Sequence, residues 1–413
     1  MKSLLIILAL CLGCTTSWAE WTAKEDVRDG VTYVTNPETP RDGDVRLDLE
    51  ELWRLGGEDD EAVLFGVIQQ IVADETGNIY VLDGQLSQIQ VFLSDGEHRR
   101  SIGREGEGPG EFRNATDMYL GPNGVLGTIQ IFPGKVVQLT TDGDPAGNLP
   151  LPEIPGGGYQ LVYHVRANSE RLVLAGAVTR VENDESMQVK YLKAFDRHGT
   201  ELARYHDVAH PSRYGGMQFQ ERHWTDFQDR WALATDGRVA AGLSFDEYRI
   251  HVWNTDGSIE RVIERPGYQR IRRSATEKKR FQRMYDALTR WSPGSSFSVS
   301  ETHETISQMF FREDGRLWVL SSAGIWQRDP GVFAHLDVYD ARGIFAQRIQ
   351  LVAPHDIVED GMFLIGDRVY VVTDFFSSWM AGLGGDEAEE VATDVQPTSL
   401  IAYQMRGATI GMK

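Results

Sequence analysis

Short runs of β-branched and aromatic residues, separated by turn signals, recur through most of the 413-residue chain. The clearest example is residues 71–112, which contain four such runs. Thr-Gly-Asn at 76–78 and Asp-Gly at 95–96 separate them and favour the positive φ angles of tight hairpins. Four short antiparallel strands cannot bury a face alone, so this segment predicts one blade of a larger ring of stacked copies.

The same layout recurs to give six units along the chain. Their first hairpin turns are centred on Gly77, Gly124, Ser169, Gly237, Gly315 and Gly366. The sixth unit lacks an outer strand, and the alternating segment Val45–Leu55 is predicted to supply it, since that pairing removes two open sheet edges. We therefore expect an all-β, six-bladed β-propeller over residues 45–407, closed by an N-terminal strand and preceded by a lead-in at 20–44.

One stretch carries a family resemblance. Gly-Asn-Ile-Tyr-Val-Leu-Asp at 77–83, Ile-Gln-Val-Phe at 89–92 and the glycine-rich segment 103–112 resemble NHL-type repeats. The whole chain resembles bacterial exported six-bladed β-propeller proteins with such repeats. The resemblance implies that the glycine-rich segment leads into the next blade, with Phe112 packed between blades.

The N-terminus has the pattern of a signal peptide. Lys2 precedes the apolar run Leu4–Leu12, which is too short to span a bilayer. Ser17-Trp18-Ala19 places small residues at −3 and −1 of a cut after Ala19, so residues 1–19 are the predicted leader. The expected location is outside the cytoplasm, periplasmic or secreted. Since the chain has no other long apolar run, no transmembrane span is expected.

The two cysteines of the chain, Cys11 and Cys14, both lie in this leader. Leu12-Gly13-Cys14 resembles a bacterial lipobox with Cys11 at a position where an aliphatic residue is usual, and a lipid anchor at Cys14 is therefore the alternative to cleavage after Ala19. With either processing the mature domain has no disulfide, so its stability must come from core burial and ring closure.

The chain is strongly acidic, with a formal net charge of −20. Such a surface repels phosphate backbones, so nucleic acid is not an expected partner. We expect a monomer whose partner is a protein or a small molecule.

Two long gaps between repeats are insertions. The first, Glu201–Arg230, is expected to be a polar loop. Its histidines and carboxylates make a metal set the alternative: His206, His210, His223, Asp207 and Asp226. Pro211 and the absence of apolar periodicity argue against the helix that would align the first two of these histidines.

The second insertion, 266–305, is predicted to be helical. Ser274–Glu277 forms a capping box, and apolar residues follow at helical spacing, which indicates an amphipathic helix over Ser274–Arg290. Its basic residues form a candidate patch for an anion or a partner: Arg272, Arg273, Lys279 and Arg280. The alternative is a solvated helix face paired with the carboxylates of the propeller itself.

Ligands of propellers usually meet the loops and first-strand ends around the central channel. The register of the repeats places the following candidates there: Gln69, Gln70, Thr116, Tyr159, Trp224, His303, Glu304 and His355.

The sequence favours an exported binding or scaffold propeller without catalysis and without a metal or other cofactor. The alternative is a metal-dependent lyase or hydrolase, similar to amidating lyases or lactonases, with a divalent metal in the central channel. In the amidating lyases a zinc-binding histidine follows the glycine-rich connection, whereas residues 113–116 here are Arg-Asn-Ala-Thr. That departure favours the binding function.

Overall fold

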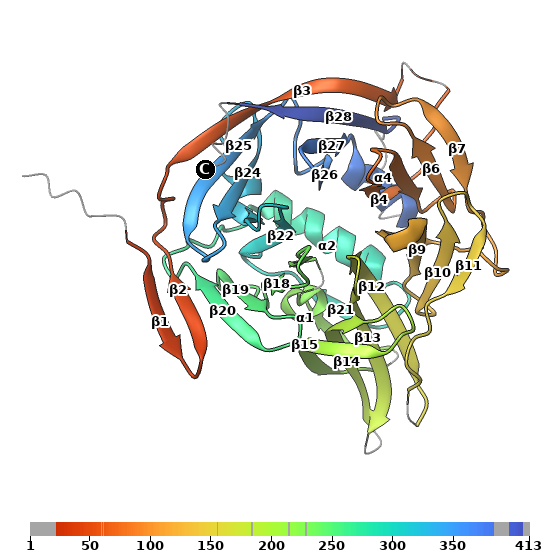
Figure 1. Ribbon diagram of the computed structural model, residues 1–413. Helices are drawn as coiled ribbons and strands as arrows, with labels where there is room; N and C mark the ends of the chain where they lie inside the picture. Colours follow the sequence, from red (N-terminus) through yellow and green to blue (C-terminus); the bar gives the residue numbers. More distant parts are fainter. Residues whose placement is uncertain are drawn as a thin grey trace, which may run out of the picture.

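The computed structural model describes residues 22–58, 60, 62–154, 156–182, 185–213, 215–227, 229–383 and 396–407. The predicted leader, with Cys11, Cys14 and Ala19, lies outside the described residues. The described chain forms six antiparallel blades around a central axis (Figure 1). The expected all-β, six-bladed propeller is therefore confirmed.

The first three blades each use four consecutive strands. The first contains β4 (Ile68–Ala73), β5 (Ile79–Asp83), β6 (Gln88–Phe92) and β7 (His98–Ile102). The second contains β8 (Ala115–Gly121), β9 (Val125–Gln130), β10 (Lys135–Thr140) and β11 (Pro145–Asn148), with a 3-10 turn, η1 (Pro122–Gly124), after β8. The third contains β12 (Tyr159–Ala167), β13 (Leu172–Glu182), β14 (Glu185–Phe195) and β15 (Glu201–Pro211).

The remaining blades follow the same plan. The fourth contains β17 (Trp231–Leu233), β18 (Val239–Ala241), β19 (Arg249–Trp253) and β20 (Ile259–Glu264). The fifth contains β22 (Ile306–Phe311), β23 (Leu317–Ser321), β24 (Val332–Tyr339) and β25 (Phe345–Val352). The sixth contains β26 (Gly361–Ile365), β27 (Arg368–Val372), β28 (Ser399–Arg406) and β3 (Asp44–Gly56).

Apolar side chains fill the space between the faces of neighbouring blades. Between the first two blades, Leu82 and Val91 pack with Met118 and Leu139. Phe112 lies in the same cluster and is fully buried, as the resemblance implied. The blade interfaces are therefore the hydrophobic core of the molecule.

The N-terminal strand closes the ring, as predicted. β3 pairs antiparallel with β28 from Ser399 opposite Gly56 to Arg406 opposite Asp48. Its first residues also pair in parallel with β25 of the fifth blade. Figure 1 shows β3 running along the rim outside both strands.

The lead-in contains two strands. β1 (Lys24–Arg28) and β2 (Val31–Thr35) form a hairpin around Asp29-Gly30, and β2 pairs in parallel with β20. Asp29-Gly30 is a hairpin signal of the same kind as those in the blades, with both residues at positive φ. We call residues 24–56 the N-terminal strap, because they contact the fourth, fifth and sixth blades in turn.

The expected polar loop over Glu201–Arg230 is wrong in its first third, which is the outer strand β15 of the third blade. Ala203 and Tyr205 point into the core, whereas Leu202 and Arg204 are exposed. This alternation has a period of two, which explains why the segment lacks helical periodicity.

The long connections emerge at one end of the ring, because strand direction alternates and they follow either the second or the outer strand of a blade. They contain β16 (Gln218–Gln220), α1 (Glu221–Thr225), α2 (Ala275–Thr289), β21 (Ser296–Ser298), α3 (Ser322–Trp326) and α4 (Phe375–Leu383). The predicted capping box of α2 is present at Ser274. No helix within the described ranges is long and apolar enough to cross a bilayer.

We predict that closure depends on the inward side chains of β3. Leu47 is 4% exposed and packs against the fifth- and sixth-blade core, so Leu47→Ala should lower the free energy of unfolding by about 2–4 kcal/mol. Leu52, on the same strand, is 40% exposed, so Leu52→Ala should change the free energy of unfolding by less than about 0.5 kcal/mol. Chemical denaturation followed by tryptophan fluorescence measures both, and equal losses would contradict the assigned closure.

Candidate functional site

Polar side chains from neighbouring blades meet around the ring axis, and Asp117 is their centre. Asp117 lies near the start of β8 and is almost fully buried. Its carboxylate accepts hydrogen bonds from Gln70 Nε2 (2.6 Å), Arg166 Nη1 (2.9 Å) and the backbone N–H of Val165 (2.9 Å). Burial alone would raise the pKa of Asp117, but Arg166 and His164 outweigh it and hold that pKa well below its usual range.

His164 is held between two carboxylates. Its Nδ1 lies 3.3 Å from Asp117 Oδ2, and its Nε2 lies 2.8 Å from Asp229 Oδ1. Burial opposes the charged form, yet the carboxylates of Asp229 and Asp117 raise the pKa of His164 to about 10. At neutral pH the ring is therefore an imidazolium with both nitrogens donating.

The same network continues towards the fifth blade. The buried Arg230 guanidinium interacts electrostatically with Asp229 and Glu304, and burial lowers its pKa. Burial also raises the pKa of Glu304, whose carboxylate lies 3.9 Å from Arg273 Nη2. We call the seven residues that follow the axial network: Gln70, Asp117, His164, Arg166, Asp229, Arg230 and Glu304.

Solvent reaches part of this network. The side chain of Asp229 is 62% exposed and that of Arg166 is 43% exposed, and His164 and Glu304 are partly exposed. Arg166 also lies over the Trp231 ring, 5.7 Å from its centroid. The network therefore offers groups of both charges to a ligand while its buried members fix their positions.

A buried ion pair joins the network to the insertions. The Arg273 guanidinium, before α2, donates to both Glu221 carboxylate oxygens, from Nη1 at 2.6 Å and from Nη2 at 2.8 Å. Tyr285 of α2 donates to the same carboxylate at 3.3 Å. The α2 segment is thus fixed to α1 by charge-assisted bonds as well as by packing.

Three of the predicted ligand residues lie at or beside the axial network. Gln70 and Glu304 are members, and Thr116 precedes Asp117. Gln69 instead packs against Gly84. A β-carbon added at Gly84 would lie only 2.7 Å from the Cγ atom of Gln69.

His303 is buried and stacks on Trp326 at 4.1 Å, and its Nδ1 accepts a hydrogen bond from Arg273. Burial, with the Arg273 charge, lowers the pKa of His303 to about 4, so the ring is neutral. It supports the Arg273 ion pair and not the exposed part of the network.

The other predicted residues lie apart. Tyr159 is exposed and packs edge-to-face against Phe132. Trp224 belongs to an aromatic cluster with Phe219 and Phe297. The structure therefore divides the predicted set among several environments.

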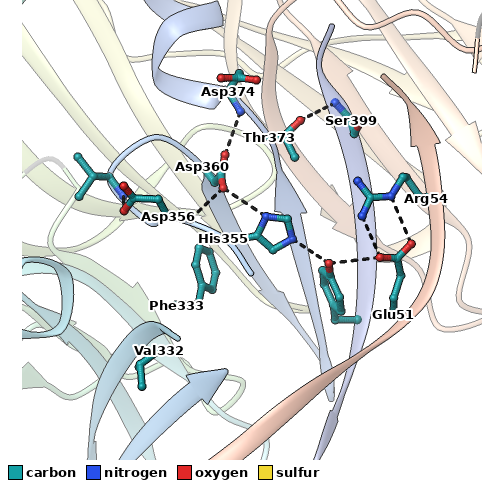
Figure 2. A network of polar contacts seen from close by, with 12 residues as sticks. Glu51, Arg54, Val332, Phe333, His355, Asp356, Asp360, Thr373, Asp374 and Ser399 are labelled. Atoms are coloured by element: carbon teal, nitrogen blue, oxygen red, sulfur yellow. Dashed lines mark hydrogen bonds and ion pairs between the residues drawn. The ribbon is translucent and has the colours of Figure 1, made fainter. Parts of the chain in front are cut away.

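His355 lies in a second polar network, between the fifth and sixth blades (Figure 2). Its Nδ1 is 3.3 Å from Asp360 Oδ2, and its Nε2 is 2.8 Å from the Tyr403 hydroxyl. That hydroxyl lies 3.4 Å from Glu51 Oε2, which also binds Arg54. The network connects the β25–β26 loop to both closing strands, β28 and β3.

The predicted basic patch is not one surface. Arg273 is buried on Glu221, and Arg280 donates to Glu359 and lies over the Phe376 ring at 3.8 Å. Arg272 and Lys279 are exposed. Two of its four members thus pair with carboxylates of the protein itself, the alternative that the sequence left open.

The histidines considered as metal ligands meet only in part. His210 lies 3.1 Å from Asp226 and stacks on His223, while the Lys190 ammonium occupies the same carboxylate at 2.9 Å. His206 packs against Phe227 instead. Within the described ranges no group of three or more histidine, cysteine or acidic side chains has a geometry suited to a metal ion.

The sequence interpretation missed five members of the axial network: Asp117, His164, Arg166, Asp229 and Arg230. Asp117 could have been noticed as an acidic residue inside an otherwise apolar strand. His164 and Arg166 share one face of an alternating strand, which was the available signal for a polar surface. Their partners were not visible, because those come from neighbouring blades.

A family model, DUF5128, described as a 6-bladed beta-propeller, matches residues 57–222. The chain is a six-bladed β-propeller. The resemblance to this architecture is confirmed, whereas the NHL type of its repeats stays a prediction. No curated protein matches the chain.

Solved structures similar to this propeller share little sequence with it. One, described as an exported protein from Bacteroides fragilis, is 16% identical, with 88% of this chain and 99% of that chain covered and a TM-score of 0.43. A member of the DUF4221 family from Bacteroides vulgatus is 11% identical, with 88% and 99% covered and a TM-score of 0.49. A gluconolactonase from Xanthomonas campestris is 9% identical, with 83% and 87% covered and a TM-score of 0.43.

The charge on His164 should make stability depend on pH. Since its folded-state pKa is about 10, above the ordinary 6.5, its contribution is complete below pH 6.5 and is lost as the pH rises through 10. His164→Gln should therefore be less stable than the wild type by about 2 kcal/mol at pH 6, with the difference shrinking towards pH 10. Urea denaturation at pH 6, 8 and 10 tests this.

His98→Gln is the matched control, because His98 is exposed on β7. Its effect should stay within about 0.5 kcal/mol at each pH. A pH-independent loss in His164→Gln would show that His164 contributes by packing and not by charge.

Proposed function

We propose that this protein is an exported, non-catalytic binding propeller that takes a small polar ligand at the axial network. The observation that carries the proposal is the exposure of Asp229 and Arg166, which pair with His164 and with the buried carboxylate of Asp117. These pairs fix the positions of the exposed groups, so a ligand meets charges that need little rearrangement.

The state of His164 favours binding over acid–base catalysis. A general base works best with a pKa near the operating pH, whereas two carboxylates keep His164 protonated at neutral pH. A fixed imidazolium suits electrostatic recognition. The location outside the cytoplasm rests on the predicted leader with cleavage after Ala19 or lipidation at Cys14, and the monomeric state is part of the same proposal.

Native mass spectrometry of the mature protein, recovered gently from its envelope fraction, tests this function. We expect the wild type to carry a small molecule and Asp229→Asn to lose it, because the amide removes the exposed negative charge. Asp236→Asn is the matched control, since Asp236 is an exposed carboxylate in the β17–β18 hairpin at the opposite end of the same blade, and should retain the ligand.

Two results would overturn the proposal. One is a wild-type protein that carries another protein and no small molecule. The other is a small molecule retained equally by Asp229→Asn. A mass excess matching a divalent ion would instead support the metal-dependent lyase or hydrolase.

A further inference from the structure

A pocket of about 600 Å³ lies between the fifth and sixth blades, at the end of the ring that carries the insertions. Its walls come from the β23–β24 connection, which includes the end of α3, and from the β25–β26 connection. The lining residues that matter here are Trp326, Arg328, Asp329, His355, Asp356 and Asp360.

The guanidinium of Arg328, in the pocket wall, already donates hydrogen bonds to other groups of the protein. Arg328 Nε donates to the Ile325 carbonyl at 2.7 Å, and Nη1 donates to the carbonyls of Val332 (3.2 Å) and Phe333 (3.0 Å). Its Nη2 donates to Asp356 Oδ1 at 2.7 Å. The guanidinium therefore shapes the wall and has little capacity left for an anionic ligand.

Carboxylates outnumber the cations at this place. Asp329, Asp356 and Asp360 line the pocket, and Asp329 is exposed with no ion pair inside the part of the chain that the structure describes. A bound cation would compensate this surplus of negative charge in the wall.

The acidic wall is held rigidly. Asp360 Oδ1 accepts the backbone N–H of Asp374 at 3.0 Å, and Oδ2 accepts that of Asp356 at 3.1 Å and faces His355 (Figure 2). His355 is fixed from its other side by Tyr403. A ligand would therefore meet preformed acceptors.

An aromatic side chain borders the same pocket. Trp326 is held by stacking on His303 and by a tilted contact with Phe281 at 6.4 Å. Indole rings attract organic cations through the ring quadrupole, and Pro330 and Pro354 add apolar surface for the body of a ligand. The wall thus combines an aromatic ring, apolar surface and surplus negative charge.

We propose that this pocket binds an organic ammonium ion, namely a protonated amine attached to a compact apolar body. The site is separate from the axial network, so this proposal does not depend on the function proposed above. The amine faces the carboxylates of Asp329 and Asp356, and the apolar body lies against Trp326.

Saturation-transfer NMR with benzylamine, benzyl alcohol and benzoate tests the proposal, because these probes share a ring and differ in charge. At pH 7 and low salt, benzylamine should bind the wild type and the other two should not. Raising the salt concentration should weaken its binding. Benzyl alcohol binding as well as benzylamine, benzoate binding better, or no probe binding would overturn the proposal without the need for any variant.

Variants then locate the site. Asp329→Asn should weaken benzylamine binding roughly tenfold, and Trp326→Leu should weaken it as well. Asp314→Asn, in the β22–β23 hairpin at the opposite end of the fifth blade, is the matched control and should bind normally. Asp229→Asn should also bind normally, which separates this pocket from the axial network. Unchanged binding in folded Asp329→Asn, or loss in Asp229→Asn, would overturn the assignment.

Discussion

Pairing of β3 on both of its edges is the interaction on which the whole ring depends. Without β3, the sixth blade ends in an open β28 edge and the fifth in an open β25 edge. Both cysteines lie in the predicted leader, so no disulfide is available to hold the mature ring closed. Closure rests on backbone hydrogen bonds and on the buried side chains of the strap, of which Leu47 is an example.

Both candidate sites depend on this closure. The axial network is made of pairs between blades, since Asp117, His164 and Asp229 belong to three consecutive units. Their separations are set by the angle between blades, which ring closure fixes. The pocket near His355 depends on closure more directly, because its polar network reaches Tyr403 on β28 and Glu51 on β3.

Local signals explain what the sequence could predict. Blade turns were identified from glycines that adopt positive φ, and α2 from the capping box at Ser274. Closure by β3 could be predicted because the sixth blade lacked one strand and the alternating segment Val45–Leu55 had not been assigned to any other blade. The β15 strand was missed since its polar exposed face hid the buried Ala203 and Tyr205.

The site was less accessible from sequence because its contacts are not local. Gln70 and Asp117 are 47 positions apart, and Asp117 and Arg166 are 49 apart. Correct register places Gln70 and Glu304 near the axis, but it does not reveal which charged residues elsewhere in the chain pair with them. It also cannot separate His355, which lies at a rim pocket, from residues that face the axis.

The strap also sets the order of events during synthesis. Glu50 of β3 and Arg406 of β28 form an ion pair although they are 356 positions apart in the chain. β3 is therefore synthesised long before the strand with which it completes the sixth blade. Contacts of such sequence separation slow folding, and unpaired strand edges expose the chain to misassembly meanwhile. Ring closure must therefore wait until β28 has been synthesised, and loss of β28 would leave β3 with only its fifth-blade neighbour.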